Sequence, residues 1–329
     1  MTLANQYRAA TAGAALFDVS DRALIEVTGR DRATFLHNFC TNDIKQLPPG
    51  AGCEAFLTNV KGRILGHMLV FAEESSLWID SDSGTQSPLL QHLDRYIITE
   101  DVQLHDRTSQ FSQFLMTGNR ALEAVATALG FVASQPPLCG RCGMTVHVGF
   151  GLRRVPLSTA SGFLMSVESA AKSDTVNRLH SERIDISDHD VLDVLRIEAV
   201  WPRYGVDITE EHLAQEAGRT AQAISFTKGC YLGQEPIARL DALGHTNREL
   251  RGIRFELPGE IAAGTVVLDA AGSQEVGKIS SVAVHPLTNC TIALAMLKTA
   301  ANAPGTRVQA RTSAGELMGG EVYAAPILS

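Results

Sequence analysis

The C-terminal part of the chain sets the strongest limit on its fold, because it consists of short strand-like segments with no convincing helix between them. The composition changes near Leu250, after which glycine, proline and asparagine separate the segments. Regular short strands with such turns are typical of a small β-barrel or sandwich. The predicted strands are Arg251–Glu256, Gly264–Leu268, Glu275–Ile279, Thr291–Leu297, Arg307–Ala310 and Gly320–Ala324. We therefore predict a C-terminal β-barrel domain over residues 247–329.

Residues 1–246 carry a different pattern, in which helices recur among mostly antiparallel strands. The strands are predicted at Ala23–Thr28, Cys53–Thr58, Ile64–Phe71, Ser76–Ile79, Val102–Asp106, Phe111–Met116, Thr145–Phe150 and Gly162–Val167. An amphipathic helix follows Asp31, and further helices are predicted at Pro88–Tyr96, Asn119–Leu129, Ala170–Leu179 and Asp188–Glu198. This recurrence predicts an α+β region with two similar lobes.

Composition and charge narrow the classes of function. Hydrophobic residues make up 45% and charged residues 19% of the 329 residues, as in a folded globular protein. The net charge of −8 argues against a general nucleic-acid binder, which usually has a basic excess. The N-terminus lacks a basic start followed by a long apolar core, and the apolar runs are too short to span a bilayer. We expect a cytoplasmic protein that binds neither nucleic acid nor membrane.

Six cysteines are spread along the chain without the spacing of a disulfide framework, which favours reduced thiols. Cys139 and Cys142 form one close pair, but no second pair or histidine cluster completes four zinc ligands. A turn that enters a strand explains the pair better, so we predict no metal site.

The densest unusual stretch is Ser225–Glu235, which combines a thiol, a cation, a phenol, an amide and a carboxylate with two glycines. Gly229 and Gly233 permit a positive φ or a close approach of the backbone to a ligand. If the segment is extended, Lys228 and Cys230 project to one side, and the ammonium favours a nucleophilic thiolate. A buried cysteine beside a surface lysine explains the same residues equally well.

A second stretch begins at the end of an apolar helix, where Glu198 is followed by Trp201 and Tyr204. The helix dipole disfavours an anion at a C-terminus, so the Glu198 carboxylate needs donors. The N3–H and 2-amino groups of a pterin supply such donors in a bidentate arrangement, and the two aromatic residues supply walls. On its own, an ion pair of Glu198 with Arg196 or Arg203 is the simpler explanation.

These stretches together resemble the YgfZ branch of the superfamily that includes the glycine cleavage T-protein. The matching segments follow one another in family order across almost the whole chain. They are FLHNFCTNDI, PGAGCEAFLTNVKGRIL, LRIEAVWPRYGVD, KGCYLGQE, VGKISS and IALAML. KGCYLGQE is highly specific to YgfZ-type proteins, whereas the other segments are shared more broadly.

The resemblance implies a three-part body around a channel for tetrahydrofolate or another reduced folate. Residues 1–246 would form two ferredoxin-like α+β lobes, with the chain exchanging between them near residues 48 and 110. The residues implied to bind the folate are Glu198, Arg196, Tyr204, Tyr231 and Gln234, and those implied to carry YgfZ-type function are Lys228 and Cys230. The implied partners are iron–sulfur enzymes or their assembly proteins.

One departure from the T-protein pattern helps to distinguish an aminomethyltransferase from a folate-binding accessory protein. T-proteins carry an acidic pair in the strand that reaches the folate, and a carboxylate there assists aminomethyl transfer. The matching positions here are Gly66 and His67, so neither is acidic. Losing a positioned catalytic group typically costs roughly 10²–10⁴-fold in rate. We expect a folate-binding accessory protein for iron–sulfur enzymes, with a folate-dependent aminomethyltransferase-like enzyme as the alternative and a scaffold without ligand as a third possibility.

Overall fold

The computed structural model describes residues 1–131, 142–147, 150–157, 162–184, 186–258 and 261–324, with the side chains of 142–147 and 150 excepted. The helices are α1 (Leu3–Ala12), α2 (Arg32–His37), α3 (Gln86–Asp94), α4 (Ala121–Leu129), α5 (Lys172–Ser181), α6 (His189–Glu198), α7 (Thr220–Ala223) and α8 (Gln234–Leu243). The strands of the first two lobes are β1 (Ala15–Asp18), β2 (Ala23–Thr28), β3 (Ala51–Thr58), β4 (Ile64–Ala72), β5 (Ser76–Ser81), β6 (Gln103–Asp106), β7 (Phe111–Thr117), β8 (Cys142–His147), β9 (Phe150–Val155) and β10 (Gly162–Glu168). The remaining strands are β11 (Arg248–Phe255), β12 (Val266–Asp269), β13 (Glu275–Val284), β14 (Thr291–Lys298), β15 (Arg307–Arg311) and β16 (Leu317–Tyr323).

The two lobes share one antiparallel sheet of ten strands, in the order β1-β7-β10-β9-β8-β3-β4-β5-β2-β6. Strands β3, β4, β5, β2 and β6 form one half, against which α2 and α3 pack, and the other five form the second half with α4 and α5. The halves join where β8 pairs with β3, with Gly143 opposite Ala51. The α+β class and its two lobes are therefore confirmed.

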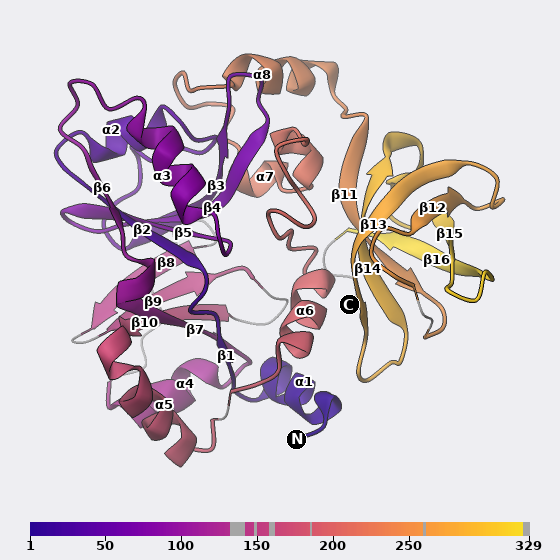
Figure 1. The fold of residues 1–329 in the computed structure, drawn as a ribbon, viewed down its shortest axis with the longest axis horizontal. Coiled ribbons are helices and arrows are strands. Elements are labelled where there is room, and N and C mark those ends of the chain that lie inside the picture. The colour runs from indigo at the N-terminus through magenta and orange to yellow at the C-terminus, as the bar shows by residue number, and fades with distance from the viewer. Residues whose placement is uncertain (132–141, 148–149, 158–161, 185, 259–260, 325–329) are drawn as a thin grey trace.

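Alternation along the strands separates the cores of the two faces, because successive side chains of a strand point to opposite sides. On β4, Met68 and Val70 belong to the core beneath α2 and α3, whereas Leu69 and Phe71 belong to a central core. That central core also contains residues of α1, α6 and the barrel. The central face of the sheet is thus the place where all three parts of the molecule meet (Figure 1).

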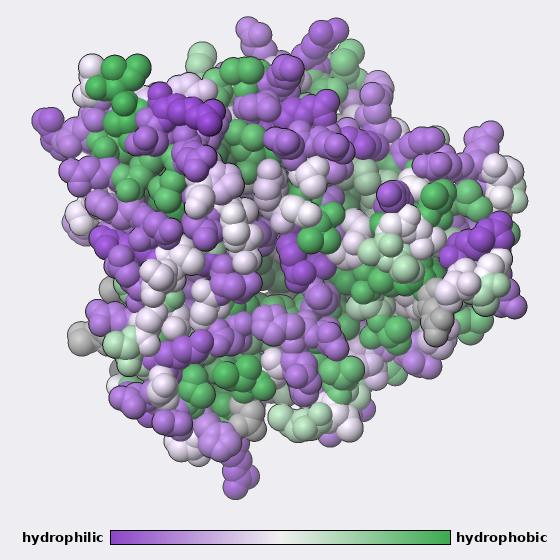
Figure 2. All heavy atoms as spheres, in the orientation of Figure 1, coloured by the Kyte–Doolittle hydropathy of each residue, from purple (hydrophilic) through white to green (hydrophobic). Residues whose placement is uncertain are grey.

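The C-terminal strands form a closed barrel in the order β11-β14-β13-β12-β15-β16, as the pattern of short strands predicted. Its interior is filled by aliphatic side chains and Phe255, and its outer residues Leu250, Ile292 and Leu294 join the central core. Hydrophobic side chains are also visible on the surface where the barrel faces α6, among a mostly polar covering (Figure 2). Among the described residues, no helix is long and apolar enough to cross a membrane.

Several elements do not appear in the sequence prediction. Helix α1 and the short strand β1 lie in a polar N-terminal stretch, and α8 begins inside the stretch that we expected to be irregular. Proline is tolerated in the first turn of a helix, and Pro236 lies there in α8. Strand β9 begins at Phe150, where the prediction ended a strand instead.

Candidate functional site

Glu198 is the last residue of α6 and is 1% exposed. The phenol of Tyr7 in α1 donates to its two carboxylate oxygens over 2.9 and 3.1 Å. Nε2 of His285, in the barrel, lies 2.9 Å from the nearer oxygen. Burial and the adjacent carboxylate raise the pKa of Tyr7 well above its usual range, so the phenol stays a donor. The carboxylate at this helix end therefore accepts a hydrogen bond from α1 and has an imidazole of the barrel close beside it.

The simpler explanation, an ion pair of Glu198 with a nearby arginine, is wrong. Arg196 contacts Asp193 over 2.6 Å and Asp207 over 2.9 Å. Arg203 also contacts Asp193, over 2.6 Å. These arginines have closer acidic partners on their own side of the helix, so neither neutralises Glu198.

A small cavity lies beside α6, where three arginines and an indole approach one another. It has a volume of about 60 Å³ and is lined by Val19, Arg22, Asp82, Leu115, Leu157, Leu164, Leu192, Arg196, Trp201 and Arg203. Tyr204 adjoins it, because its backbone N–H donates to the Asp82 carboxylate over 2.7 Å. Ligand pockets usually measure about 300–1,000 Å³, so a pterin at this place has to displace lining side chains.

The position that carries the T-protein carboxylate in the resemblance is occupied by a buried histidine with an acidic partner. His67 Nε2 lies 2.9 Å from Glu54 in the neighbouring strand, and Arg219 binds Glu54 with two hydrogen bonds of 2.8 and 2.5 Å. Trp201 lies against both, with its ring 4.7 Å from the His67 ring and 4.7 Å from the Arg219 guanidinium. Burial would raise the pKa of Glu54, but Arg219 and His67 outweigh it and lower the pKa to about 2.

Lys228 is buried, and its ammonium uses three donors on carbonyl oxygens. These belong to His37 at the end of α2, to Cys40 and to Asn42, at 2.5, 2.7 and 2.8 Å. The same ammonium lies 4.7 Å from the centre of the Tyr231 ring. Burial lowers the pKa of Lys228. The lysine therefore fixes the segment after α2 to the 228–232 loop.

Cys230 is exposed, whereas Lys228 and Tyr231 near it are buried. The two glycines of this stretch also differ from each other. Gly233 has φ of +84°, and a Cβ there would lie 2.4 Å from the Asn59 carbonyl oxygen, so only glycine fits. A Cβ on Gly229 would meet only His37, at 3.9 Å, so this position does not require glycine. Gln234 follows as the first residue of α8.

The structure links the two groups of predicted residues through the strands between them. Tyr204 and Tyr231 pack in one apolar cluster around Phe56. The Asn42 amide donates to the Glu54 carbonyl over 2.8 Å, while the Asn42 carbonyl accepts from Lys228. A continuous set of contacts thus runs from Trp201 through the Glu54 cluster to the Cys230 loop. The catalytic and folate-binding roles of the named residues stay predictions.

Sequence reasoning missed Tyr7, His285, Glu54 and Arg219. Glu54 had a usable signal, because a carboxylate inside the apolar strand sequence AGCEAFLT needs a buried partner. The others gave no local signal. Among the residues that the structure describes, no three His, Cys, Asp or Glu side chains are grouped as metal ligands. Cys139 lies outside the described residues, and β8 begins at Cys142.

Comparison with known proteins gives two family matches that together span most of the chain. The GCVT N-terminal domain matches residues 2–228, and the glycine cleavage T-protein C-terminal barrel domain matches residues 248–328. A putative chloroplastic transferase of Arabidopsis thaliana is 28% identical over 82% of this chain and 62% of its own length. The mitochondrial iron–sulfur cluster assembly factor of Homo sapiens is 28% identical over 82% of this chain and 75% of its own. The tRNA-modifying protein YgfZ of Serratia proteamaculans is 26% identical over 71% and 69%.

Solved structures agree on the fold. The glycine cleavage aminomethyltransferase T of Bartonella henselae superposes with a TM-score of 0.87 at 20% identity, covering 98% of this chain and 89% of its own. The chain spans about three fifths of the length of the plant relative that it matches. With both domain models matched in order and YgfZ among its relatives, the chain belongs to the glycine cleavage T-protein family.

Proposed function

We propose that this protein binds a reduced folate, tetrahydrofolate or a derivative, and serves iron–sulfur enzymes or their assembly proteins. The observation that carries the folate half is the Glu198 carboxylate, which is buried at a helix C-terminus among donors. The similarity to an iron–sulfur cluster assembly factor supports the second half.

The Glu198 carboxylate can accept further hydrogen bonds from a ligand. An ionised carboxylate has about four lone-pair sites, and Tyr7 and His285 occupy mainly the side of Oε1. The Tyr7 hydroxyl is 3.1 Å from Oε2, so this oxygen has the weaker existing bond. A pterin amino group that donates to Oε2 would complete the carboxylate. Glu198 does not line the 60 Å³ cavity beside Trp201, so side chains between the two would have to move to admit the ring.

Aminomethyl transfer is disfavoured by the chemistry of the Glu54 cluster. A general base works best when its pKa is near the operating pH. Glu54 has a pKa of about 2, and its two carboxylate oxygens accept hydrogen bonds from Nε and Nη2 of Arg219, so it is a poor base. The pair of Glu54 and His67 then serves to hold Trp201 and Arg219 in place.

Calorimetric titration with tetrahydrofolate tests the first half. Glu198→Gln keeps the shape and the Tyr7 contact but removes the charge, and should weaken binding by about tenfold or more, as expected for a lost charge-assisted bond. Glu182→Gln is the matched control, because Glu182 follows the last turn of α5 and is exposed. Equal affinity of both variants, or no heat with the wild-type chain, would remove Glu198 and the folate from the proposal.

Complementation in cells that lack the chain tests the second half. Cys230→Ser should fail to restore the activity of an iron–sulfur enzyme, whereas Cys290→Ser, at a buried cysteine in the barrel, should restore it. Full restoration by Cys230→Ser would contradict the assigned role of the thiol without affecting the folate measurement.

The alternative is a folate-dependent transferase, which the similarity to an aminomethyltransferase of Symbiobacterium thermophilum, 27% identical over 92% of this chain, favours. This alternative predicts that the protein forms methylene-tetrahydrofolate from an aminomethyl donor, and that this activity depends on His67. Formation at background rate with the folate-loaded protein would exclude it.

A further inference from the structure

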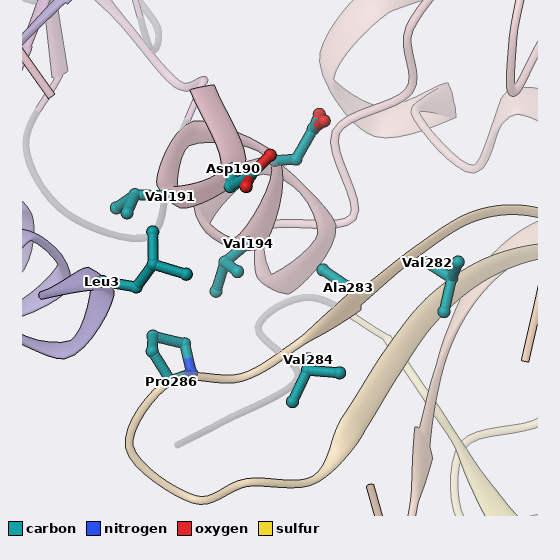
Figure 3. A pocket seen from close by; sticks show the side chains of 9 residues that line it. Leu3, Asp190, Val191, Val194, Val282, Ala283, Val284 and Pro286 are labelled. Atoms are coloured by element: carbon teal, nitrogen blue, oxygen red, sulfur yellow. The ribbon is translucent and has the colours of Figure 1, made fainter. Parts of the chain in front are cut away.

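A groove outside the proposed folate site lies where α1, α6 and the β13–β14 hairpin meet. It has a volume of about 260 Å³ and is lined by Leu3, Asp190, Val191, Asp193, Val194, Val282, Ala283, Val284 and Pro286. Leu3, Val194, Val284 and Pro286 surround a common space, with the Asp190 carboxylate at its edge (Figure 3). Leu3 is 44% and Val284 49% exposed, so the apolar walls reach the surface.

The composition of this groove suits side chains of another protein better than a small molecule. Its volume is below the usual range for ligand pockets, and seven of its nine lining residues are apolar, with two aspartates as the charged ones. Exposed Leu287 continues the apolar surface from Pro286 along the hairpin. Apolar surface of this kind with a polar rim is typical of protein interaction sites, where one or two anchor side chains fill a pocket.

The negative charge at the edge of the groove favours a partner segment with a basic side chain. Two aspartates line the groove, and Asp193 is neutralised by Arg196 and Arg203. Asp190 is exposed, and its carboxylate has no hydrogen-bond or ion-pair partner among the described residues. A second copy of this chain would bring one acidic rim against another in a two-fold interface, and each copy has a net charge of −8. A lysine or arginine on the partner would instead meet Asp190.

We infer that this groove docks a segment of a partner protein in which a large apolar side chain lies next to a lysine or arginine. The apolar side chain enters between Val194 and Val284, and the basic group meets Asp190. This inference does not depend on folate binding, because none of these residues lines the cavity beside Trp201.

The same three walls also hold Glu198. Leu3 lies one helical turn from Tyr7 in α1, and Val194 lies one turn from Glu198 in α6. His285 stands between Val284 and Pro286 on the hairpin. A docked segment would therefore contact the elements that carry Tyr7 and His285, the two neighbours of the Glu198 carboxylate.

Selection of a phage-displayed library of random peptides on the immobilised full chain tests the inference. An enriched peptide is then synthesised with a fluorophore and titrated by anisotropy. We expect large apolar residues beside lysine or arginine, and affinity reduced about tenfold or more by Val284→Asp and by Asp190→Lys. Exchanging the basic residue of the peptide for glutamate should restore binding to Asp190→Lys.

Two matched controls isolate the groove. Val266→Asp changes an exposed valine on another barrel strand, and Asp174→Lys changes an exposed first-turn aspartate of α5. Both should leave peptide affinity unchanged. No enriched peptide, peptides without a basic residue, or equal affinity across all four variants would overturn the inference. Self-association in sedimentation that Val284→Asp abolishes would assign the groove to a second copy and would also overturn it.

Discussion

Replacing Lys228 by methionine separates a structural role of this lysine from a chemical one. Methionine keeps most of the aliphatic volume and removes the ammonium, so the carbonyl oxygens of His37, Cys40 and Asn42 lose a charged donor. An unsatisfied buried polar group costs about 1–3 kcal/mol. We take the low end for each carbonyl, because the buried ammonium itself is costly, as its lowered pKa indicates. The expected loss is about 3 kcal/mol of the free energy of unfolding, or roughly 4–6 °C in Tm for a chain of this length.

Thermal unfolding measured by circular dichroism provides the first readout, with Lys61→Met at an exposed lysine as the control. The rate of Cys230 alkylation below the transition is the second readout, followed by mass spectrometry of the modified peptide. A structural lysine predicts the lower Tm with an alkylation rate changed by less than about threefold, since the ammonium is bound to carbonyls. An unchanged Tm with a much slower alkylation would refute the reasoning and would support activation of the thiol by Lys228.

Three further outcomes follow from the buried groups. Glu54→Gln should lower the free energy of unfolding by roughly 3 kcal/mol near neutral pH, because the pKa of Glu54 falls from 4.5 to about 2 on folding, which stabilises the folded state at any pH above the unfolded-state pKa. The difference between the two proteins should shrink as the pH falls from about 4.5 towards 2. A difference in urea unfolding that does not change with pH would contradict this. Cys230 should react with iodoacetamide first, because it is exposed, and Cys40 should react only on unfolding, because burial raises the pKa of its thiol to about 11. Early labelling of Cys40 would show that the segment after α2 opens. Tyr7→Phe should destabilise the protein by about 1.5–3 kcal/mol, since it removes a donor from the buried Glu198 carboxylate; a neutral effect on the urea midpoint would mean that another donor replaces it.

The accuracy of the sequence prediction varied with the length of the periodic pattern. Strand β4 and helix α6 were predicted within a residue or two, because their apolar residues recur over many positions with one period. Helix α1 was missed, since its sequence LANQYRAATA has a weak apolar face and packs through Tyr7, Ala9 and Ala10 on a core built by distant segments. Helix α8 was missed because its start follows the left-handed Gly233, in a stretch dominated by turn residues.

The amino-acid sequence by itself determined the α+β body, the barrel strands and the identity of the KGCYLGQE loop, because these depend on local periodicity, turn residues and a motif in one continuous stretch. Only the tertiary structure decided what each charged side chain contacts. Residues almost 200 positions apart supply the Tyr7–Glu198 bond, and others 165 apart supply the Glu54–Arg219 pair. A buried charge is stable only with a partner, and the sequence shows the charge without showing which distant segment brings that partner. For the same reason Lys228, which the motif associates with Cys230, was found on the carbonyls after α2.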